Sequence, residues 1–148
     1  MSKIGPSIVI RAREFAYKKH EGQYRDNGVT PYIRHPQDVA QILEIVASND
    51  FELHAAAWLH DTIEDTDTTY EELVAEFGQD VADLVMEVTQ EGQKDDHGYY
   101  FPRLKTQRGI MLKFADRLSN LSDMGSWNEQ RRQHYLKRSK FWKSDALD

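Results

Sequence analysis

Apolar residues recur along this chain at intervals of three, four and seven residues, the spacing that places side chains on one face of an α-helix. In residues 7–20, one such stripe comprises Ile8, Ala12, Phe15 and Ala16. No segment shows the strict alternation of apolar and polar residues that is typical of a half-buried strand. The pattern therefore predicts an all-α protein.

The same spacing predicts six further helices. The second begins at Pro36, because proline is favoured at the first helical position. The third covers residues 51–63 and is apolar on almost every side, so we expect it near the middle of the bundle. The fourth helix is expected from a Thr69–Glu72 capping box to Gly78, and the fifth from a cap at Asp80 to Val88. The sixth is expected to run through Ile110, Phe114, Leu118 and Leu121, and the last to cover Glu129 to Trp142.

The length favours one domain. A chain of 148 residues with 39% apolar and 11% aromatic residues can bury one sizeable core. No repeat, low-complexity tract or Gly/Ser linker divides it. We therefore expect a compact single-domain helical bundle over 1–148, with its core at about 8–124 and a basic C-terminal helix at about 129–142.

Several classes of protein are excluded by what the sequence lacks. It contains no cysteine, which removes disulfide scaffolds, thiol catalysis and thiolate metal sites. It has no apolar run long enough to span a membrane, and residues 1–6 lack the apolar stretch of a signal peptide. These observations predict a cytoplasmic protein.

Charge is distributed unevenly around a net value of −6. Residues 35–96 hold seventeen acids and one base, whereas the segments on either side are basic. Such an arrangement suits a metal-centred site with a rim that holds an anionic ligand. The alternative is that the acidic helices simply face solvent.

The most informative side chains lie in residues 59–66. His60 and Asp61 offer a nitrogen and an oxygen donor, a mixture that suits manganese, iron or zinc. Glu64 and Asp65 follow one turn later and would share this face if the helix persists that far. A cation, or a proton retained by one acid, would relieve the repulsion between the carboxylates. Alternatively, the acids end the helix or cap the next turn.

Two residues elsewhere could complete a metal site. His35 stands at a helix start and would bring a second imidazole. Asp116 is flanked by apolar residues on an amphipathic helix, and a buried aspartate needs a cation or a metal as partner. An ion pair with Lys113 or Arg117 is the other interpretation.

Three strings make the sequence recognisable. They are Tyr32-Ile33-Arg34-His35-Pro36, Leu59-His60-Asp61-Thr62-Ile63-Glu64-Asp65-Thr66 and Lys113-Phe114-Ala115-Asp116-Arg117-Leu118-Ser119-Asn120-Leu121. The pattern resembles the HD-domain metal phosphohydrolases and, more narrowly, the hydrolase domain of the RelA/SpoT alarmone enzymes, over about residues 8–124. Because the chain stops where a synthetase domain would begin, it looks like a stand-alone small alarmone hydrolase.

The resemblance implies a reaction and a set of catalytic residues. It implies hydrolysis of guanosine 3′,5′-bis(diphosphate) and its pentaphosphate analogue, with release of pyrophosphate from the 3′ position to give GDP or GTP. Glu64 and Asp65 would position and activate the attacking water. One manganese(II) ion would be held by His35, His60, Asp61 and Asp116.

The resemblance also suggests substrate-binding residues. Arg25 matches a basic residue near the guanine base, although a solvent-exposed loop charge is the alternative. Asn120 and Lys113 share the helical face of Asp116 and would line the nucleoside and phosphate pocket. Residues 91–109 look individual and are interpreted as a rim containing Arg103, Lys105 and Arg108, or else as a mobile loop. Ser122 stands where the family often has a basic residue that contacts the phosphates, so this phosphate contact is not expected here.

Other functions remain possible at this point. The basic, aromatic-rich C-terminal helix could bind nucleic acid, pack its aromatics, or lend a phosphate contact. The net acidity argues against nucleic acid, so we expect a small nucleotide as the partner. The alternatives are an HD-domain enzyme acting on another nucleotide or on NADPH, and a non-catalytic nucleotide-binding or antitoxin-type module.

Overall fold

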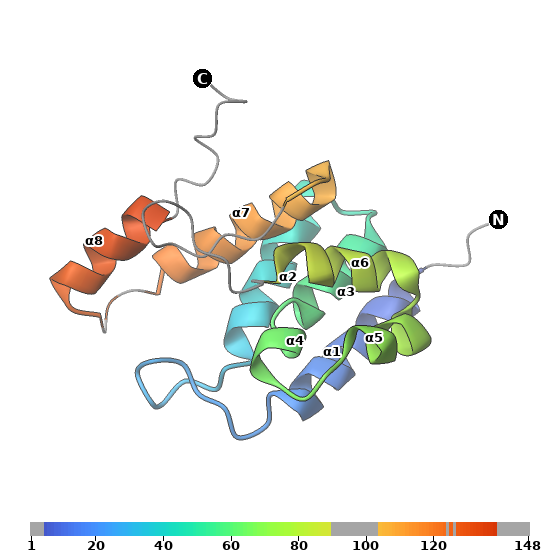
Figure 1. Ribbon diagram of the computed structural model, residues 1–148, viewed down its shortest axis with the longest axis horizontal. Coiled ribbons are helices and arrows are strands. Elements are labelled where there is room, and N and C mark those ends of the chain that lie inside the picture. The colour runs from blue at the N-terminus through green and yellow to red at the C-terminus, as the bar shows by residue number, and fades with distance from the viewer. Residues whose placement is uncertain (1–4, 90–103, 124, 126, 139–148) are drawn as a thin grey trace.

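The computed structural model describes residues 5–89, 104–123, 125 and 127–138. These residues form eight helices and no strand, which confirms the all-α prediction (Figure 1). The helices are α1 (Pro6–Lys19), α2 (Arg34–Val46), α3 (Phe51–Leu59), α4 (Thr62–Asp65), α5 (Tyr70–Phe77), α6 (Gln79–Val88), α7 (Gln107–Leu121) and α8 (Glu129–Arg138). No helix among them is long and apolar enough to cross a membrane. Residues 139–142 of the expected last helix lie outside the described residues.

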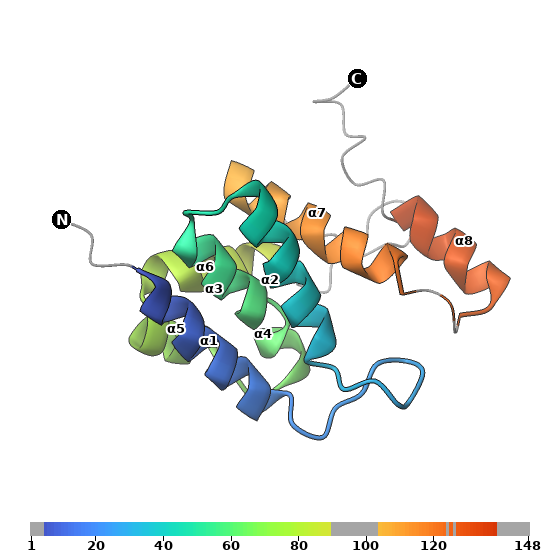
Figure 2. The same ribbon diagram turned by 180° about the vertical axis from the view of Figure 1, so that it is seen from behind.

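The core is built around α3. All residues from Leu53 to Leu59 are buried, including the three consecutive alanines that allow neighbouring helices to approach closely. Helices α1, α2, α6 and α7 all pack against α3, and the views from the two sides show it enclosed by them (Figures 1 and 2). The apolar composition of this segment correctly predicted its central position.

The expected single helix over 51–63 is wrong. Helix α3 ends at Leu59, and a new short helix, α4, begins at Thr62. Between them the backbone of Asp61 adopts φ −102° and ψ 0°, and the hydroxyl of Thr62 donates to the carbonyl of Leu59 at 2.7 Å. This side-chain bond substitutes for a helical backbone bond, and the chain changes direction there.

Two predicted helix caps had different outcomes. The hydroxyl of Thr69 accepts a hydrogen bond from the backbone N–H of Glu72 at 3.1 Å, so the cap of α5 is confirmed. The cap at Asp80 is wrong, because α6 begins at Gln79 with Gly78 as its N-cap. Gly78 has φ +91°, a conformation that glycine adopts without strain, and it allows α6 to follow α5 directly.

Helix α7 has its polar face inside and part of its apolar face outside. Its buried positions include Lys113, Asp116, Arg117 and Ser119. The apolar stripe that predicted this helix is instead largely exposed, with Ile110, Phe114 and Leu118 exposed by 40%, 42% and 54%. The outer stripe borders an apolar hollow of about 470 Å³ between α2 and α7.

A carboxylate from α6 fixes the start of α7. One oxygen of Glu87 accepts hydrogen bonds from the backbone N–H groups of Lys105 at 2.8 Å and Thr106 at 2.9 Å. Gly109 allows this approach, since a Cβ atom there would lie 1.9 Å from that carboxylate oxygen. The position of α7 is therefore set by α6 as well as by its own sequence.

Candidate metal centre

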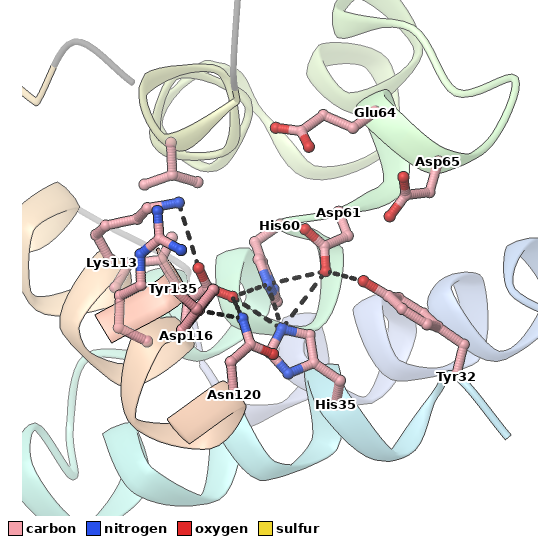
Figure 3. A pocket seen from close by; sticks show the side chains of 13 residues that line it. Tyr32, His35, His60, Asp61, Glu64, Asp65, Lys113, Asp116, Asn120 and Tyr135 are labelled. Atoms are coloured by element: carbon pink, nitrogen blue, oxygen red, sulfur yellow. Dashed lines mark hydrogen bonds and ion pairs between the residues drawn. The ribbon is translucent and has the colours of Figure 1, made fainter. Parts of the chain in front are cut away.

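Four side chains from three parts of the chain converge on one point. They are His35 of α2, His60 and Asp61 at the end of α3, and Asp116 of α7, and one donor atom from each lies within 4.8 Å of all the others. The two histidines and Asp116 are buried. Figure 3 shows the four groups directed toward a common centre.

Both histidine rings are oriented by bonds on the side away from the cluster. Nδ1 of His60 lies 2.7 Å from the carbonyl oxygen of Ala57, so this nitrogen donates. Nδ1 of His35 lies 3.0 Å from the hydroxyl of Ser119. In each ring Nε2 therefore faces the cluster, the arrangement in which a histidine is held ready to bind a metal.

The two carboxylates lie against the imidazole Nε2 atoms. One oxygen of Asp116 is 2.8 Å from Nε2 of His35 and 3.3 Å from Nε2 of His60. One oxygen of Asp61 is 3.1 Å from Nε2 of His60 and accepts a hydrogen bond from the hydroxyl of Tyr32 at 2.6 Å (Figure 3). Each aspartate thus has an oxygen at the centre of the cluster.

Charge interactions outweigh the cost of burial in this cluster. Burial alone would raise the pKa of Asp116, but Lys113 and the two histidines hold that pKa well below its usual range. Burial would lower the pKa of His60, yet Asp61 and Asp116 raise it well above its usual value. Two ionised carboxylates are therefore stabilised by positive charge placed between them, which a bound cation would also supply.

The donor set fits a divalent transition metal. Two imidazole nitrogens and two carboxylate oxygens suit manganese, iron or zinc better than calcium or magnesium, which prefer oxygen alone. The hydrogen bonds from the Nδ1 atoms of the two histidines to Ala57 and Ser119 hold the imidazole rings in place for a metal. The residues present thus fit a single divalent ion.

Two further carboxylates stand at the edge of the cluster. Glu64 and Asp65 of α4 line the same hollow, of about 290 Å³, as the four converging side chains (Figure 3). Asp65 is exposed overall, but the walls of the hollow partly cover its carboxylate, and this partial burial together with the charge of Asp61 raises its pKa. Because the helix breaks at His60–Asp61, these acids belong to a separate element, yet they still face the cluster.

The expected substrate-binding residues divide into two groups. Lys113, which lies 3.2 Å from Asp116, and Asn120 line the hollow of the cluster. Arg25 does not line it, but donates to the side-chain oxygen of Asn120 at 3.1 Å. Lys105 is exposed just before α7, Arg108 bonds to Asp50 instead, and neither lines the hollow. Arg103, like most of the loop expected at 91–109, lies outside the described residues.

Three further polar side chains, not predicted as site residues, line the hollow: Tyr32, Arg117 and Tyr135. Tyr32 is three residues before His35 in a string already recognised, so its spacing was an available signal. Arg117 was considered only as an ion-pair partner of Asp116. Tyr135 of α8 accepts a hydrogen bond from Asn120 at 2.8 Å, a contact that no local pattern indicates.

A second hollow, of about 340 Å³, adjoins the first. It shares Tyr32, Asn120 and Tyr135 with the metal-ligand hollow and adds residues of the 20–31 loop and of α8. Its aromatic wall includes Trp127, whose ring centroid lies 5.2 Å from that of Tyr135. Tyr135 of α8 and Trp127, which precedes that helix, thus pack toward the site.

Comparisons with known proteins agree with this geometry. Residues 12–97 match the HD domain family. The chain is 38% identical to a guanosine-3′,5′-bis(diphosphate) 3′-pyrophosphohydrolase MESH1 of Xenopus tropicalis, with 95% of this chain and 83% of that protein covered. It is 42% identical to a guanosine-3′,5′-bis(diphosphate) 3′-pyrophosphohydrolase of Aquifex aeolicus over 87% of this chain, but over only 19% of that longer protein.

A solved structure is similar as well. It is described as a metazoan ortholog of SpoT that hydrolyzes ppGpp and plays a role in starvation responses. The TM-score is 0.77 at 30% identity, with 94% of this chain and 85% of that one covered.

Proposed function

The chain belongs to the HD-domain family, among its guanosine-3′,5′-bis(diphosphate) 3′-pyrophosphohydrolases, and on this basis we propose manganese-dependent hydrolysis of that alarmone. The products are GDP and pyrophosphate, or GTP and pyrophosphate from the pentaphosphate analogue. One observation carries the proposal: two histidines and two aspartates converge beside a pair of exposed carboxylates. A free nucleotide, rather than a nucleic acid, suits the net charge of −6, and we propose a cytoplasmic location.

His35, His60, Asp61 and Asp116 would hold one manganese(II) ion. Such an ion supplies Lewis-acid polarisation of a phosphoryl oxygen and lowers the pKa of water. Four protein ligands would leave positions open on a six-coordinate ion.

The carboxylates of α4 would handle the proton. In the reaction, the oxygen of water bonds to the 3′-phosphorus while the bond from that phosphorus to the ribose 3′-oxygen breaks. A carboxylate oxygen of Asp65 or Glu64 would accept the proton that the water loses, and the departing 3′-oxygen would take up a proton from solvent. Their exposed position on the rim of the hollow supports this role, because a general base must reach the substrate.

The nucleoside would lie toward the second hollow. Arg25 is held there by Asn120 at 3.1 Å and by Asp123 at 3.0 Å. A planar guanidinium fixed in this way can stack on a purine. This placement leaves the 3′ end of the nucleotide nearest the metal ligands.

Turnover by metal-depleted protein tests the proposal. We expect release of GDP and intact pyrophosphate from guanosine 3′,5′-bis(diphosphate) on addition of manganese, and less with magnesium, zinc or iron. GTP and NADPH serve as competing substrates. If only NADPH is hydrolysed, the metal-dependent mechanism still holds but the alarmone is the wrong substrate. If no nucleotide is hydrolysed although manganese binds, the chain is a binding module.

A further inference from the structure

Arg117 has a buried guanidinium with unused hydrogen-bond donors. The residue is only 4% exposed, and its Nε and Nη2 atoms have no hydrogen-bond partner among the described residues. Its guanidinium carbon lies 5.0 Å from the centre of the Tyr135 ring. A buried, permanently charged group with unpaired donors is rare in folded proteins, and its retention calls for an explanation.

The neighbouring cations are already occupied. Lys113, one helical turn before Arg117, forms an ion pair with Asp116 at 3.2 Å. Arg25 forms one with Asp123 at 3.0 Å. Of the basic side chains that line the two adjoining hollows, Arg117 is the one with buried donor atoms, Nε and Nη2, that have no hydrogen-bond partner in the part of the chain described here.

The hollow needs positive charge to admit a phosphate. Four of the residues that line it, Asp61, Glu64, Asp65 and Asp116, are acids. An incoming diphosphate would be repelled by acids that a single metal ion does not fully neutralise. A guanidinium offers two parallel donors that match phosphate oxygens, and it is less strongly hydrated than an ammonium group.

We propose that Arg117 binds the diphosphate that leaves from the 3′ position of the substrate, with Nε and Nη2 donating to its non-bridging oxygens. The inference rests on the proposed function and adds a phosphate-binding residue to it. Beside the guanidinium, Asn120 donates a hydrogen bond to the hydroxyl of Tyr135 at 2.8 Å, which links α7 to α8 at this side of the hollow.

The thermal stability of an Arg117 variant distinguishes a ligand-binding role from a purely structural role. Replacing a buried, incompletely paired charge with an apolar side chain of similar length is often neutral or stabilising. If the charge is retained for a ligand, Arg117→Met should unfold at the temperature of the wild type or above it. If Arg117 supports the fold, this variant should unfold at a clearly lower temperature.

Binding of inorganic pyrophosphate tests the inference directly. The dissociation constant would be measured by titration calorimetry at a fixed free manganese concentration. We expect it to rise about 10- to 100-fold in Arg117→Met, because two charge-assisted hydrogen bonds are lost. Arg117→Lys should weaken binding by roughly tenfold or less, because the lysine ammonium group keeps the charge but replaces the two parallel donors of the guanidinium with one. Arg13→Gln, which removes an exposed charge from α1, is the matched control and should change nothing.

Each outcome decides for or against the inference. Unchanged pyrophosphate affinity in folded Arg117→Met overturns it, and so does a lower unfolding temperature for both Arg117 variants. If Arg117→Met does not fold, weaker binding by a folded Arg117→Lys supports it and unchanged binding overturns it. Alarmone turnover by the wild type is a separate measurement. Its absence would overturn the proposed function, whereas Arg117-dependent pyrophosphate binding would still stand.

Discussion

Helices α3 and α7 are neighbours that solve the problem of burial in opposite ways. Helix α3 places apolar side chains on every side and is enclosed by other helices. Helix α7 buries Lys113, Asp116 and Arg117 while Phe114 and Leu118 remain largely exposed. Hydrophobic burial explains the first helix completely and fails to explain the second.

The difference separates folding from chemistry within one small core. A helix that buries charges loses hydration energy, and it keeps its place only where those charges find partners. In α7 the partners are the histidines of the cluster and, for Arg117, the ligand we infer. Substitutions in α3 should therefore act on stability, and substitutions on the inner face of α7 should act on binding and turnover.

Replacing Asp116 with alanine should abolish both metal binding and activity, because a ligand is lost outright and its oxygen contacts both histidines. Manganese binding would be measured by calorimetry, and turnover with the alarmone. Retention of stoichiometric metal by this variant would contradict the assignment of Asp116 as a ligand. The circular dichroism of the variant controls for folding.

Replacing Leu53 with alanine should produce the converse result. Leu53 is fully buried in α3, so the loss of its side chain should lower the free energy of unfolding by about 2–5 kcal/mol. Turnover per folded molecule should stay close to that of the wild type well below the unfolding temperature. If turnover per folded molecule falls although the variant is assayed well below its unfolding temperature, α3 contributes to the reaction and is not merely a scaffold.

Replacing Asp65 with asparagine should leave the metal in place and reduce turnover on the order of 100-fold, the scale expected for a lost general base. Asp65 lies on α4, which is separate from the helix that carries His60. Glu64→Gln is the parallel variant, because both acids line the same hollow. Loss of metal equal to that in Asp116→Ala would mean that the role assigned to Asp65 is wrong.

The Asp50–Arg108 pair joins the two helices and gives a pH-dependent prediction. Asp50 caps α3 and accepts from Nε of Arg108 at 2.9 Å. Burial would raise the pKa of Asp50, but the hydrogen bonds from Arg108 and Leu53 lower it. A lowered folded-state pKa stabilises the protein above the unfolded-state pKa of about 3.9, and this contribution disappears as pH falls through the folded-state value.

Asp50→Asn should therefore be less stable than the wild type at neutral pH, and the difference should shrink below about pH 4. Because both partners are partly exposed, screening should limit the effect to about 1 kcal/mol or less. Urea unfolding at several pH values would measure it. A difference that grows on acidification would have the wrong sign for this mechanism.

Replacing Leu118 with glutamine should have the smallest effect. Its side chain is 54% exposed on the outer stripe of α7, so the free energy of unfolding should change by less than about 0.5 kcal/mol. Turnover should be unaffected. A large loss of stability in thermal unfolding would show that the outer stripe is covered in solution, and the contrast between the two helices would then weaken.

Local signals in the sequence were sufficient for most of the helices, and the family resemblance of three short strings indicated the four converging side chains. The stripe of α1, the cap at Thr69 and the motif strings depend on residues a few positions apart, and the structure agrees with them. The break after Leu59 was not predicted, because the apolar pattern continues to Ile63 and conceals the hydroxyl bond of Thr62.

The rest of the pocket depends on contacts between residues far apart in sequence. Tyr135 and Asn120 meet across the turn between α7 and α8, and Arg25 reaches Asn120 from a loop near the N-terminus. Which face of α7 would be buried was equally hidden, since its apolar stripe indicates the wrong side. Only the tertiary arrangement shows that Arg117 has donors to spare.

The carboxylate of Glu87 bears on the order in which the protein assembles. Helices α5 and α7 are both capped by a threonine, Thr69 and Thr106, but the cap of α7 is itself held by α6, because Glu87 accepts hydrogen bonds from the backbone N–H and the hydroxyl of Thr106. We therefore expect α7 to become fully ordered only after α6 has docked, late in folding. Since Asp116 lies on α7, a nascent chain would acquire its metal affinity in one of the last steps, after the rest of the bundle has closed.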